Sequence, residues 1–421
     1  MFTAAFLTVW AGQLVSIIGS GLTSFALGLW VLDKTGEVTP YAFILVITVV
    51  SRLLLAPVMG TLIDRWGARR SMILGDLVGA IATLGIAMLV HSDQIAVWHV
   101  YLLSFVSGAA IALRGPAFLA LTTQLTPAGQ LGRVNGLLQL AQSSSYLVSP
   151  MLATVLLGTV GLAWLIAIDV ASYGVGLVTL LAVQTPVSAA RARTAWTFHE
   201  SMAGIRYVVA QPGLLGLLLF FFCINIATAM VQVLIIPMVR SIDHAVIGRV
   251  LTIAAVGMLL GSIAMSAWGG PRRRLTGVLG FAVLQGAMLS IAGLRPSIPL
   301  ISASAFLYLF TFPLVAGCNE AFWMEITPEH LRGRVFAARG GLGASSLPLA
   351  YALAGPLTDR VFEPLLAPGG ALAGSVGSLI GTGPGRGIGF LFMVFGVMVI
   401  VAAVTTYAYA PVRRYIIKDL A

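Results

Sequence analysis

Long hydrophobic stretches alternate with short polar turns along almost the whole chain. Twelve of these stretches are long enough to form transmembrane helices, since a helix needs about 20 residues to cross the ~30 Å hydrocarbon core of a bilayer. They lie near residues 5–32, 40–63, 71–90, 97–121, 134–158, 161–184, 213–239, 248–268, 275–294, 298–322, 334–357 and 386–410. The pattern predicts an all-α membrane protein with twelve transmembrane helices.

One long polar segment, from Gln184 to Gln211, interrupts this pattern. It opens with Thr-Pro and continues with the apolar spacing of a short amphipathic helix, which would lie at the membrane surface. We therefore expect three parts: an N-terminal six-helix bundle (1–184), a cytoplasmic linker with an amphipathic helix (185–211) and a C-terminal six-helix bundle (212–421).

The composition agrees with a membrane protein and argues against other classes. Of the 421 residues, 59% are hydrophobic and only 9% are charged, so a water-soluble fold could not bury the apolar surface. The net charge of +10 does not indicate a nucleic-acid partner, because the arginines are scattered between the apolar runs. The two cysteines lie within apolar segments and show no disulfide or metal-binding spacing, so neither a metal nor a cofactor is expected.

The sequence also lacks motifs for catalysis or nucleotide binding. The glycine-rich stretch 381–387 has no Lys-Ser/Thr pair of the kind that completes a phosphate-binding loop. His199-Glu200 has no second histidine at metalloprotease spacing. We therefore do not expect an enzyme or an ATP-driven pump.

Lysine and arginine residues are distributed unevenly between the two ends of the expected helices. With the turn at residues 60–70 on one side, sixteen lie on that side and six on the other, while Arg52 and Arg114 lie within helices. Cytoplasmic loops carry the excess of positive charge, so the richer side is expected to face the cytoplasm. Both termini would then be cytoplasmic, in a protein of the bacterial cytoplasmic (inner) membrane.

The two halves of the chain share a sequence repeat. The pattern Thr-Pro-x4-Gly-Arg-Val begins at Thr126 and again at Thr327, and the same offset of 201 residues relates Gly60 to Gly261. Repeated units in the same orientation are typical of transporters whose halves are related by an axis along the membrane normal.

The turn after the second apolar stretch carries a family resemblance. Its sequence, Gly60-Thr-Leu-Ile-Asp64-Arg65-Trp-Gly67-Ala-Arg69-Arg70, resembles the Gly-x-x-x-Asp-Arg-x-Gly-x-Arg-Arg loop of the major facilitator superfamily. The two Pro-x4-Gly-Arg-Val turns, the stretch Ile168-Asp169-Val-Ala-Ser172-Tyr173 and Gly385-Arg386-Gly387-Ile388 resemble the branch with macrolide-efflux and enterobactin-type siderophore exporters. The resemblance implies twelve helices in two six-helix pseudo-repeats that expose a central site alternately to either side.

This resemblance also implies a role for the turn. Gly60, Asp64, Arg65, Gly67, Arg69 and Arg70 would form a gating loop in which Asp64 pairs with the start of helix eleven. The arginines would hold Asp64 and bind lipid headgroups. Asp76, near the same end of the third helix, is expected to belong to this polar network. The alternative is a basic loop that only sets the topology.

Ionisable residues within membrane helices are costly and therefore candidates for function. Arg52 lies about 12 residues into its helix, or ~18 Å at 1.5 Å per residue, so it is expected near the bilayer midplane. It needs a partner, which Asp169 could supply. For Asp169, a structural ion pair is the alternative to a role in transport. Arg114 would either line the inner cavity or pair with Asp64 or Glu320.

Polar side chains recur at helical spacing on the first, fifth and seventh expected helices, which line the cavity in the facilitator family. These faces consist of Gln13, Ser16, Ser20 and Thr23; of Asn135, Gln139, Gln142, Tyr146 and Ser149; and of Asn225, Thr228 and Gln232. We expect them to line a wet central path. Hydrogen bonding between helices, which is common for polar residues in lipid, is the alternative.

The resemblance favours a secondary active transporter that exports amphipathic small molecules, such as macrolide-, siderophore- or peptide-like natural products. Protons are the expected coupling ion, although helix one carries no acid and helix four lacks the Arg and Gln-Gly pattern of many proton-coupled exporters. The chain is expected to act as a monomer in contact with membrane lipids. An importer of the same fold is the alternative, and a membrane enzyme or lipid-handling protein is a remote one.

Overall fold

The structure is a computed structural model, and it describes residues 4–125, 131–183, 206–243, 246–328 and 332–418. Within these residues every regular element is helical. The chain divides into two compact units, Met1–Thr194 and Ala195–Ala421. The predicted linker helix falls largely on residues 184–205, outside the described residues.

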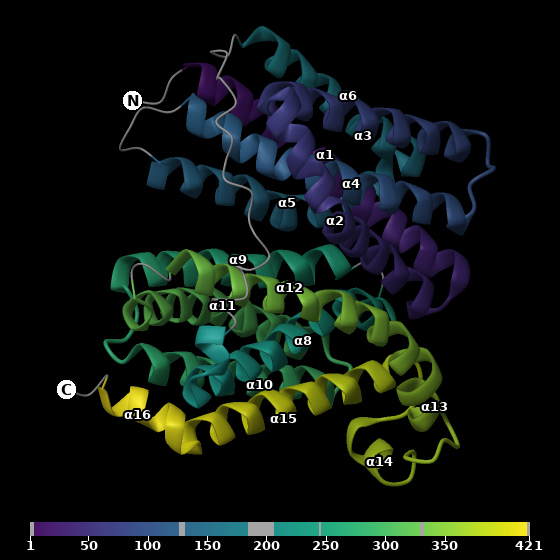
Figure 1. Cartoon of the computed structure of the whole chain (residues 1–421). Helices are drawn as coiled ribbons and strands as arrows, with labels where there is room; N and C mark the ends of the chain where they lie inside the picture. Colours follow the sequence, from purple (N-terminus) through teal and green to yellow (C-terminus); the bar gives the residue numbers. More distant parts are fainter. Residues whose placement is uncertain (1–3, 126–130, 184–205, 244–245, 329–331, 419–421) are drawn as a thin grey trace. The chain divides into compact units, whose positions relative to one another are not determined.

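The first unit contains six long helices (Figure 1). They are α1 (Ala4–Thr35), α2 (Val38–Trp66), α3 (Ala68–His91), α4 (Val97–Gln124), α5 (Leu131–Thr159) and α6 (Gly161–Ala182). Along α1, two clusters of buried apolar side chains hold the unit together. One includes Phe6, Met72, Leu121 and Leu180 from α1, α3, α4 and α6. The other includes Leu22, Ala153 and Leu165 from α1, α5 and α6.

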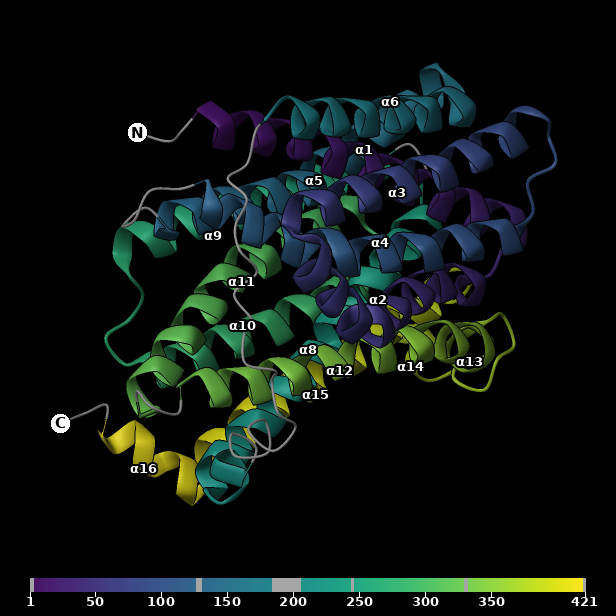
Figure 2. The ribbon, with the colours of Figure 1, turned by 45° about the horizontal axis from the view of Figure 1, so that its top comes forward.

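The second unit contains six more long helices and several short ones. The long helices are α8 (Pro212–Arg240), α9 (Ile247–Trp268), α10 (Arg274–Leu294), α11 (Ile298–Ile326), α12 (Arg332–Leu357) and α15 (Arg386–Ala408). The short ones are η3 (Thr358–Phe362), α13 (Glu363–Leu366), α14 (Val376–Ile380) and α16 (Ala410–Lys418). The segment with α13 and α14 lies at one end of α15 and α16 at the other (Figures 1 and 2).

Each of the twelve predicted transmembrane segments falls on one of these long helices. Ten of the helices are long and apolar enough to cross a membrane. The other two, α5 and α12, span 29 and 26 residues, but glycine, serine and charged or amide side chains interrupt their apolar sequence. The all-helical membrane fold is thus confirmed, whereas apolar length supports ten of the twelve predicted spans.

The two units repeat the same packing scheme. In the first, α2 packs on α4, α3 on α4 and α6, and α1 on α5 and α6. In the second, α9 packs on α11, α10 on α11 and α15, and α8 on α12 and α15. The Gly-Arg-Val residues of the sequence repeat, at 132–134 and 333–335, lie in α5 and α12, which are equivalent in this scheme.

Glycines allow close approach in both units, as small residues do between membrane helices. A Cβ atom at Gly108 of α4 would lie 2.3 Å from the carbonyl oxygen of Thr48 on α2. A Cβ at Gly261 of α9 would lie 2.0 Å from that of Phe310 on α11. Gly60, by contrast, has open space around it, so the sequence match between Gly60 and Gly261 does not reflect a shared packing role.

Replacing Gly293 with alanine is expected to destabilise the second unit by about 1–3 kcal/mol, the usual cost of overpacking. The new Cβ would lie 2.1 Å from the carbonyl oxygen of Gly389 on α15, and a backbone atom cannot move aside like a flexible side chain. Gly280→Ala in the same helix is the matched control, because a Cβ there meets no atom within 4 Å. Thermal unfolding in detergent measures both, and equal melting temperatures would contradict the packing argument.

A side chain from a different helix, Glu363 of α13, caps the N-terminus of α15. The carboxylate of Glu363 accepts hydrogen bonds from the backbone N–H groups of Gly385 and Ile388, both at 3.2 Å. Burial raises the pKa of this carboxyl above its ordinary value. The buried Arg386 donates from Nη2 to the carbonyl oxygen of Gly293 at 2.6 Å. The glycine-rich stretch 381–387 therefore leads into the capped N-terminus of α15.

Candidate functional site

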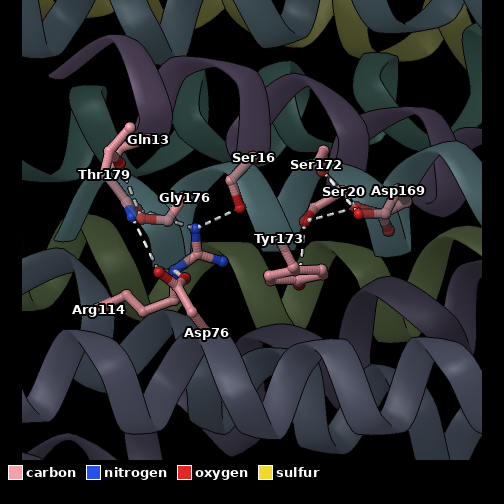
Figure 3. Close-up of polar contacts among 10 residues, drawn as sticks. All are labelled: Gln13, Ser16, Ser20, Asp76, Arg114, Asp169, Ser172, Tyr173, Gly176 and Thr179. Atoms are coloured by element: carbon pink, nitrogen blue, oxygen red, sulfur yellow. Dashed lines mark hydrogen bonds and ion pairs between the residues drawn. The ribbon is translucent and has the colours of Figure 1, made fainter. Parts of the chain in front are cut away.

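A buried ion pair joins α3 and α4 in the first unit (Figure 3). Arg114 Nε lies 2.8 Å from Asp76 Oδ1, and the Asp76 side chain has no exposed surface. Gln13 of α1 completes a ring, because its Nε2 donates to Asp76 Oδ2 at 2.9 Å and its Oε1 accepts from Arg114 Nη2 at 3.1 Å. Arg114 Nη2 also donates to Ser16 Oγ at 3.0 Å.

Glycines on the neighbouring helices make room for this ring. A Cβ at Gly75 of α3 would lie 2.6 Å from Cγ of Arg114, and one at Gly176 of α6 would lie 3.3 Å from Nε2 of Gln13. The ring lies between the two apolar clusters along α1. Ionised groups in such a place are stable only when they are paired and hydrogen-bonded.

A second buried carboxyl, Asp169 of α6, lies farther along α1 (Figure 3). Its Oδ1 accepts hydrogen bonds from Ser172 Oγ at 3.2 Å and from Ser20 Oγ at 3.3 Å. Ser20 Oγ also lies 3.0 Å from the Tyr173 hydroxyl oxygen, within hydrogen-bonding distance. The Arg114 guanidinium carbon lies 5.3 Å from the centre of the Tyr173 ring, so the two carboxyls belong to one continuous network around a single guanidinium.

The structure changes the predicted pairing of these residues. Asp76, which we expected in the Asp64 network, pairs with Arg114. Arg114 does not pair with Asp64, which is exposed at the end of α2, and Glu320 forms an ion pair with Arg339 within the second unit. The sequence prediction overlooked Asp76 as the partner of Arg114 because depth along two different helices is hard to compare from sequence.

Arg52 does not form the predicted pair with Asp169. It is half-buried on α2, and Asp169 is held by hydroxyl groups from α1 and α6 instead. Among the described residues no carboxylate forms an ion pair with Arg52.

The loop between α2 and α3 turns at Gly67, whose φ of 81° favours glycine. Arg69 binds the last turn of α6, with Nε donating to the carbonyl oxygen of Leu180 at 2.9 Å and Nη2 to that of Leu181 at 3.0 Å. These carbonyls lack partners within their own helix, so a cation there satisfies them and complements the helix dipole. Asp64, Arg65 and Arg70 are exposed.

Replacing Arg69 with alanine is expected to lower the stability of the first unit by about 1 kcal/mol or more, because two hydrogen bonds from a charged donor are lost. Arg70→Ala is the matched control, since it removes an equal charge from an exposed neighbouring position. Thermal unfolding in detergent compares the two. If both variants melt at the same temperature, the bonds from Arg69 to α6 do not contribute to stability.

The polar side chains that we predicted to line a cavity have different partners on the three helices. On α1, Gln13 is 1% exposed and takes part in the buried ring, which corresponds to the alternative of hydrogen bonding between helices. On α5, Ser149 donates to the Ile18 carbonyl of α1 at 3.0 Å. The side chains of Asn135, Gln139, Gln142 and Tyr146 lie outside the described part of the chain. On α8, Gln232 Oε1 accepts from the Tyr351 hydroxyl at 2.7 Å.

Asn225 lies in a cleft within the second unit. The cleft has a volume of about 400 Å³ and is built by α8, α11 and α12. Its lining residues are Leu218, Leu219, Phe221, Phe222, Asn225, Asn319, Arg339, Gly340 and Gly343. Arg339, which pairs with Glu320, was counted in the sequence among the charges at the cytoplasmic end of the helix. Its position seven residues into α12 indicates that it lies farther along the helix than a loop residue would.

No metal centre accompanies these sites in the described residues, where no three His, Cys, Asp or Glu side chains are grouped to hold an ion. The network in the first unit can hold and exchange a proton, because it contains two carboxyls. The cleft in the second unit can hold an organic molecule.

Comparison with known proteins identifies the family. A sequence model of the Major Facilitator Superfamily matches residues 9–351. Macrolide efflux protein A of Streptococcus pyogenes is 27% identical over 370 residues, which cover 85% of this chain and 90% of that protein. The multidrug efflux pump Tap of Mycolicibacterium fortuitum is 22% identical over 352 residues, covering 81% and 86%.

The solved structures agree on the fold. The crystal structure of the nucleoside transporter NupG has a TM-score of 0.69 at 12% identity, covering 97% of this chain and all of that one. At this identity the likeness concerns the fold alone. The family match, the helices and the related efflux proteins together show that the chain belongs to the Major Facilitator Superfamily, whose members are multi-pass membrane transporters and not enzymes.

Proposed function

We propose that this transporter exports macrolide-like amphipathic small molecules by alternating access, driven by the proton gradient. The observation that carries the proposal is the likeness to macrolide efflux protein A over 90% of that protein's length. The similarity to a pump named for multidrug efflux favours an amphipathic substrate class over sugars or nucleosides.

The charge balance of the first unit supports proton coupling. Asp76 and Asp169 are both buried, and the described contacts of their network include one cation, Arg114. If both carboxyls were ionised, the network would carry an uncompensated negative charge at low dielectric, which is costly. Asp76 has the guanidinium beside it, whereas Asp169 has hydroxyl donors only. A proton that neutralises the network therefore belongs on Asp169.

The remaining sequence-based assignments are part of the same proposal. The loop from Gly60 to Arg70 acts as a conformational latch through Asp64, and the bonds from Arg69 to α6 hold its α3 end in place. Arg52 contributes to the water-filled path, in line with its partial exposure and the lack of a described ion pair. Twelve spans, cytoplasmic termini, an inner-membrane location and a monomeric state complete the topology we propose.

Accumulation of radiolabelled erythromycin, a macrolide, in a bacterial strain without its own macrolide pumps tests this function. Cells that express the transporter should accumulate less drug than cells with the empty vector. A protonophore should abolish the difference. Higher accumulation in expressing cells would indicate import. An unchanged difference after the gradient has collapsed would exclude proton coupling.

A further inference from the structure

The short helix α16 packs against the start of α8 at one end of the second unit (Figure 1). A break at Tyr409, whose ψ is 115°, separates it from α15. The Tyr415 hydroxyl donates to Oε1 of Gln211 at 2.8 Å. A Cβ at Gly213 of α8 would lie 2.8 Å from the carbonyl oxygen of Pro411. Close packing and a hydrogen bond therefore fix α16 on the second unit.

The two sides of α16 differ in exposure and in chemistry. Val412 has no exposed surface, and Tyr415 is half-buried with its ring centre 6.2 Å from that of Phe322 on α11. Arg413 and Arg414 are exposed. The apolar side therefore belongs to the protein, while the cations face its surroundings. Amphipathic helices with basic polar faces typically lie along the membrane surface.

Other cations lie at the same end of the second unit. A Cβ at Gly293, near the end of α10, would lie 2.1 Å from the carbonyl oxygen of Gly389, near the start of α15, so the two helices are antiparallel. The start of α10 therefore lies beside the end of α15, and α10 also packs on α16. The exposed arginines here include Arg272 and Arg273 of the α9–α10 loop, together with Arg413 and Arg414 of α16.

No carboxylate forms an ion pair with any of these four arginines in the part of the chain that the structure describes. The carboxylates in the last two turns of α11 already have partners, since Glu320 pairs with Arg339 and Glu325 with Arg274. Neighbouring cations without counter-charges repel one another, and bound anions relieve this repulsion. This end of the second unit therefore carries a surplus of positive charge.

Exposed aromatic side chains indicate the depth of these cations in the membrane. Trp268 is the last residue of α9, Tyr407 lies in the last turn of α15, and both are exposed. Tryptophan and tyrosine are enriched at the level of the lipid headgroups. Arg272 follows Trp268 by four residues, and Arg413 follows Tyr407 by six. The four arginines therefore lie just outside the hydrocarbon core, at the level of the lipid phosphates.

We propose that the surface formed by α16 and the α9–α10 loop binds the phosphate groups of anionic phospholipids in the adjoining leaflet. The guanidinium groups of Arg272, Arg273, Arg413 and Arg414 donate to the phosphate oxygens, and each can form two parallel hydrogen bonds. Clusters of basic residues on amphipathic helices, or next to transmembrane helices, bind anionic lipids in this way.

A lipid surface explains the arrangement better than a soluble anion does. Exposed ion pairs are weak individually, whereas a leaflet presents many phosphates in one plane, beside the exposed rings of Trp268 and Tyr407. The lipid is also connected to the transmembrane helices, because α16 holds the start of α8 through the bond from Tyr415 to Gln211. The inference requires only that the chain lies in a membrane, and it does not depend on the transported substrate.

Lipid selection by the purified full-length protein tests this surface. The protein is equilibrated with detergent micelles that contain equal amounts of phosphatidylglycerol and phosphatidylcholine, and mass spectrometry then counts the bound lipids. The wild type is expected to enrich phosphatidylglycerol by about tenfold. Combining Arg413→Gln with Arg414→Gln should lower this enrichment by about threefold or more. Arg249→Gln with Arg295→Gln is the matched control, because it removes two exposed arginines from the opposite end of the second unit.

Thermal unfolding in the same micelles gives a second measurement. Phosphatidylglycerol should raise the melting temperature of the wild type and of the control above the value in phosphatidylcholine alone. The rise should be smaller in the α16 double variant. In phosphatidylcholine alone the three proteins should melt together, because the exchanged arginines form no ion pair within the described residues.

The control decides between a specific surface and general attraction. Wild-type enrichment in the control, with a loss in the α16 double variant, would support the proposal. Undiminished enrichment in the α16 double variant would overturn it. An equal loss in both double variants would also overturn it, since net charge alone would then attract the lipid. Loss of the enrichment on adding glycerophosphate, but not chloride at the same ionic strength, would assign the surface to a soluble anion instead.

Discussion

Replacing Arg114 with methionine is expected to abolish transport and to remove most of the folded protein from the membrane. The change leaves Asp76 buried without a cation and takes donors from Gln13 and Ser16. Breaking a buried ion pair by removing one partner typically costs about 3–5 kcal/mol, a large fraction of the stability of a whole domain. The amount of membrane-inserted protein and its melting temperature in detergent measure the effect.

A double variant separates the charge from the packing. Adding Asp76→Asn to Arg114→Met removes both charges, and a neutral pair costs far less to bury than a lone carboxylate. We expect the double variant to regain folded protein but not transport. A single variant with wild-type stability, or a double variant that is equally unstable, would show that the ion pair does not hold α3 and α4 together.

The positions of the helices could be predicted from the sequence because membrane crossing imposes a length and an apolar composition on each span. The same rule explains the weaker cases, α5 and α12, whose polar and glycine residues interrupt the apolar sequence. The repeat was also visible in the sequence, since Thr126 and Thr327 precede equivalent helices, although the matching of Gly60 with Gly261 did not extend to their packing.

The pairing of charges could not be predicted, because it depends on how each helix is rotated toward its neighbours. Asp76 and Arg114 lie on adjacent helices, and Gly75 allows the arginine side chain to pass between them. The sequence around either residue does not identify the other as its ion-pair partner. The predicted pairing of Arg52 with Asp169 failed for the same reason: the α6 carboxyl faces serines of α1 and α6 instead of α2.

The cleft in the second unit was not predicted because the part of its lining that α8 contributes is largely apolar. Leucine and phenylalanine residues of α8 cannot be distinguished in a sequence from the lipid-facing residues of any membrane helix. The informative residues were Asn225, whose polar face was predicted to line a central path, and Arg339, one of the sixteen cations assigned to the cytoplasmic side. An arginine two turns inside a helix, followed by two glycines, indicates a pocket wall when it is combined with a nearby amide-bearing helix.

Asp169→Asn is expected to abolish proton-driven transport while leaving the fold almost unchanged. An asparagine carbonyl can accept the same hydrogen bonds from Ser20 and Ser172, and its volume is nearly that of aspartate, so the melting temperature should stay close to that of the wild type. The side chain can no longer take up or release a proton at neutral pH. Proteoliposomes with an imposed proton gradient should therefore show no gradient-driven accumulation of erythromycin.

Exchange of erythromycin at equilibrium, with drug on both sides and no gradient, separates coupling from substrate binding. This exchange should persist in Asp169→Asn, because it requires no net uptake or release of a proton. Ser172→Ala is the control: it removes one hydrogen bond to Asp169 but keeps the ionisable carboxyl, so it should retain gradient-driven transport. Wild-type accumulation by Asp169→Asn would remove Asp169 from the proton path and leave Asp76, beside its guanidinium, as the carboxyl that must carry the proton.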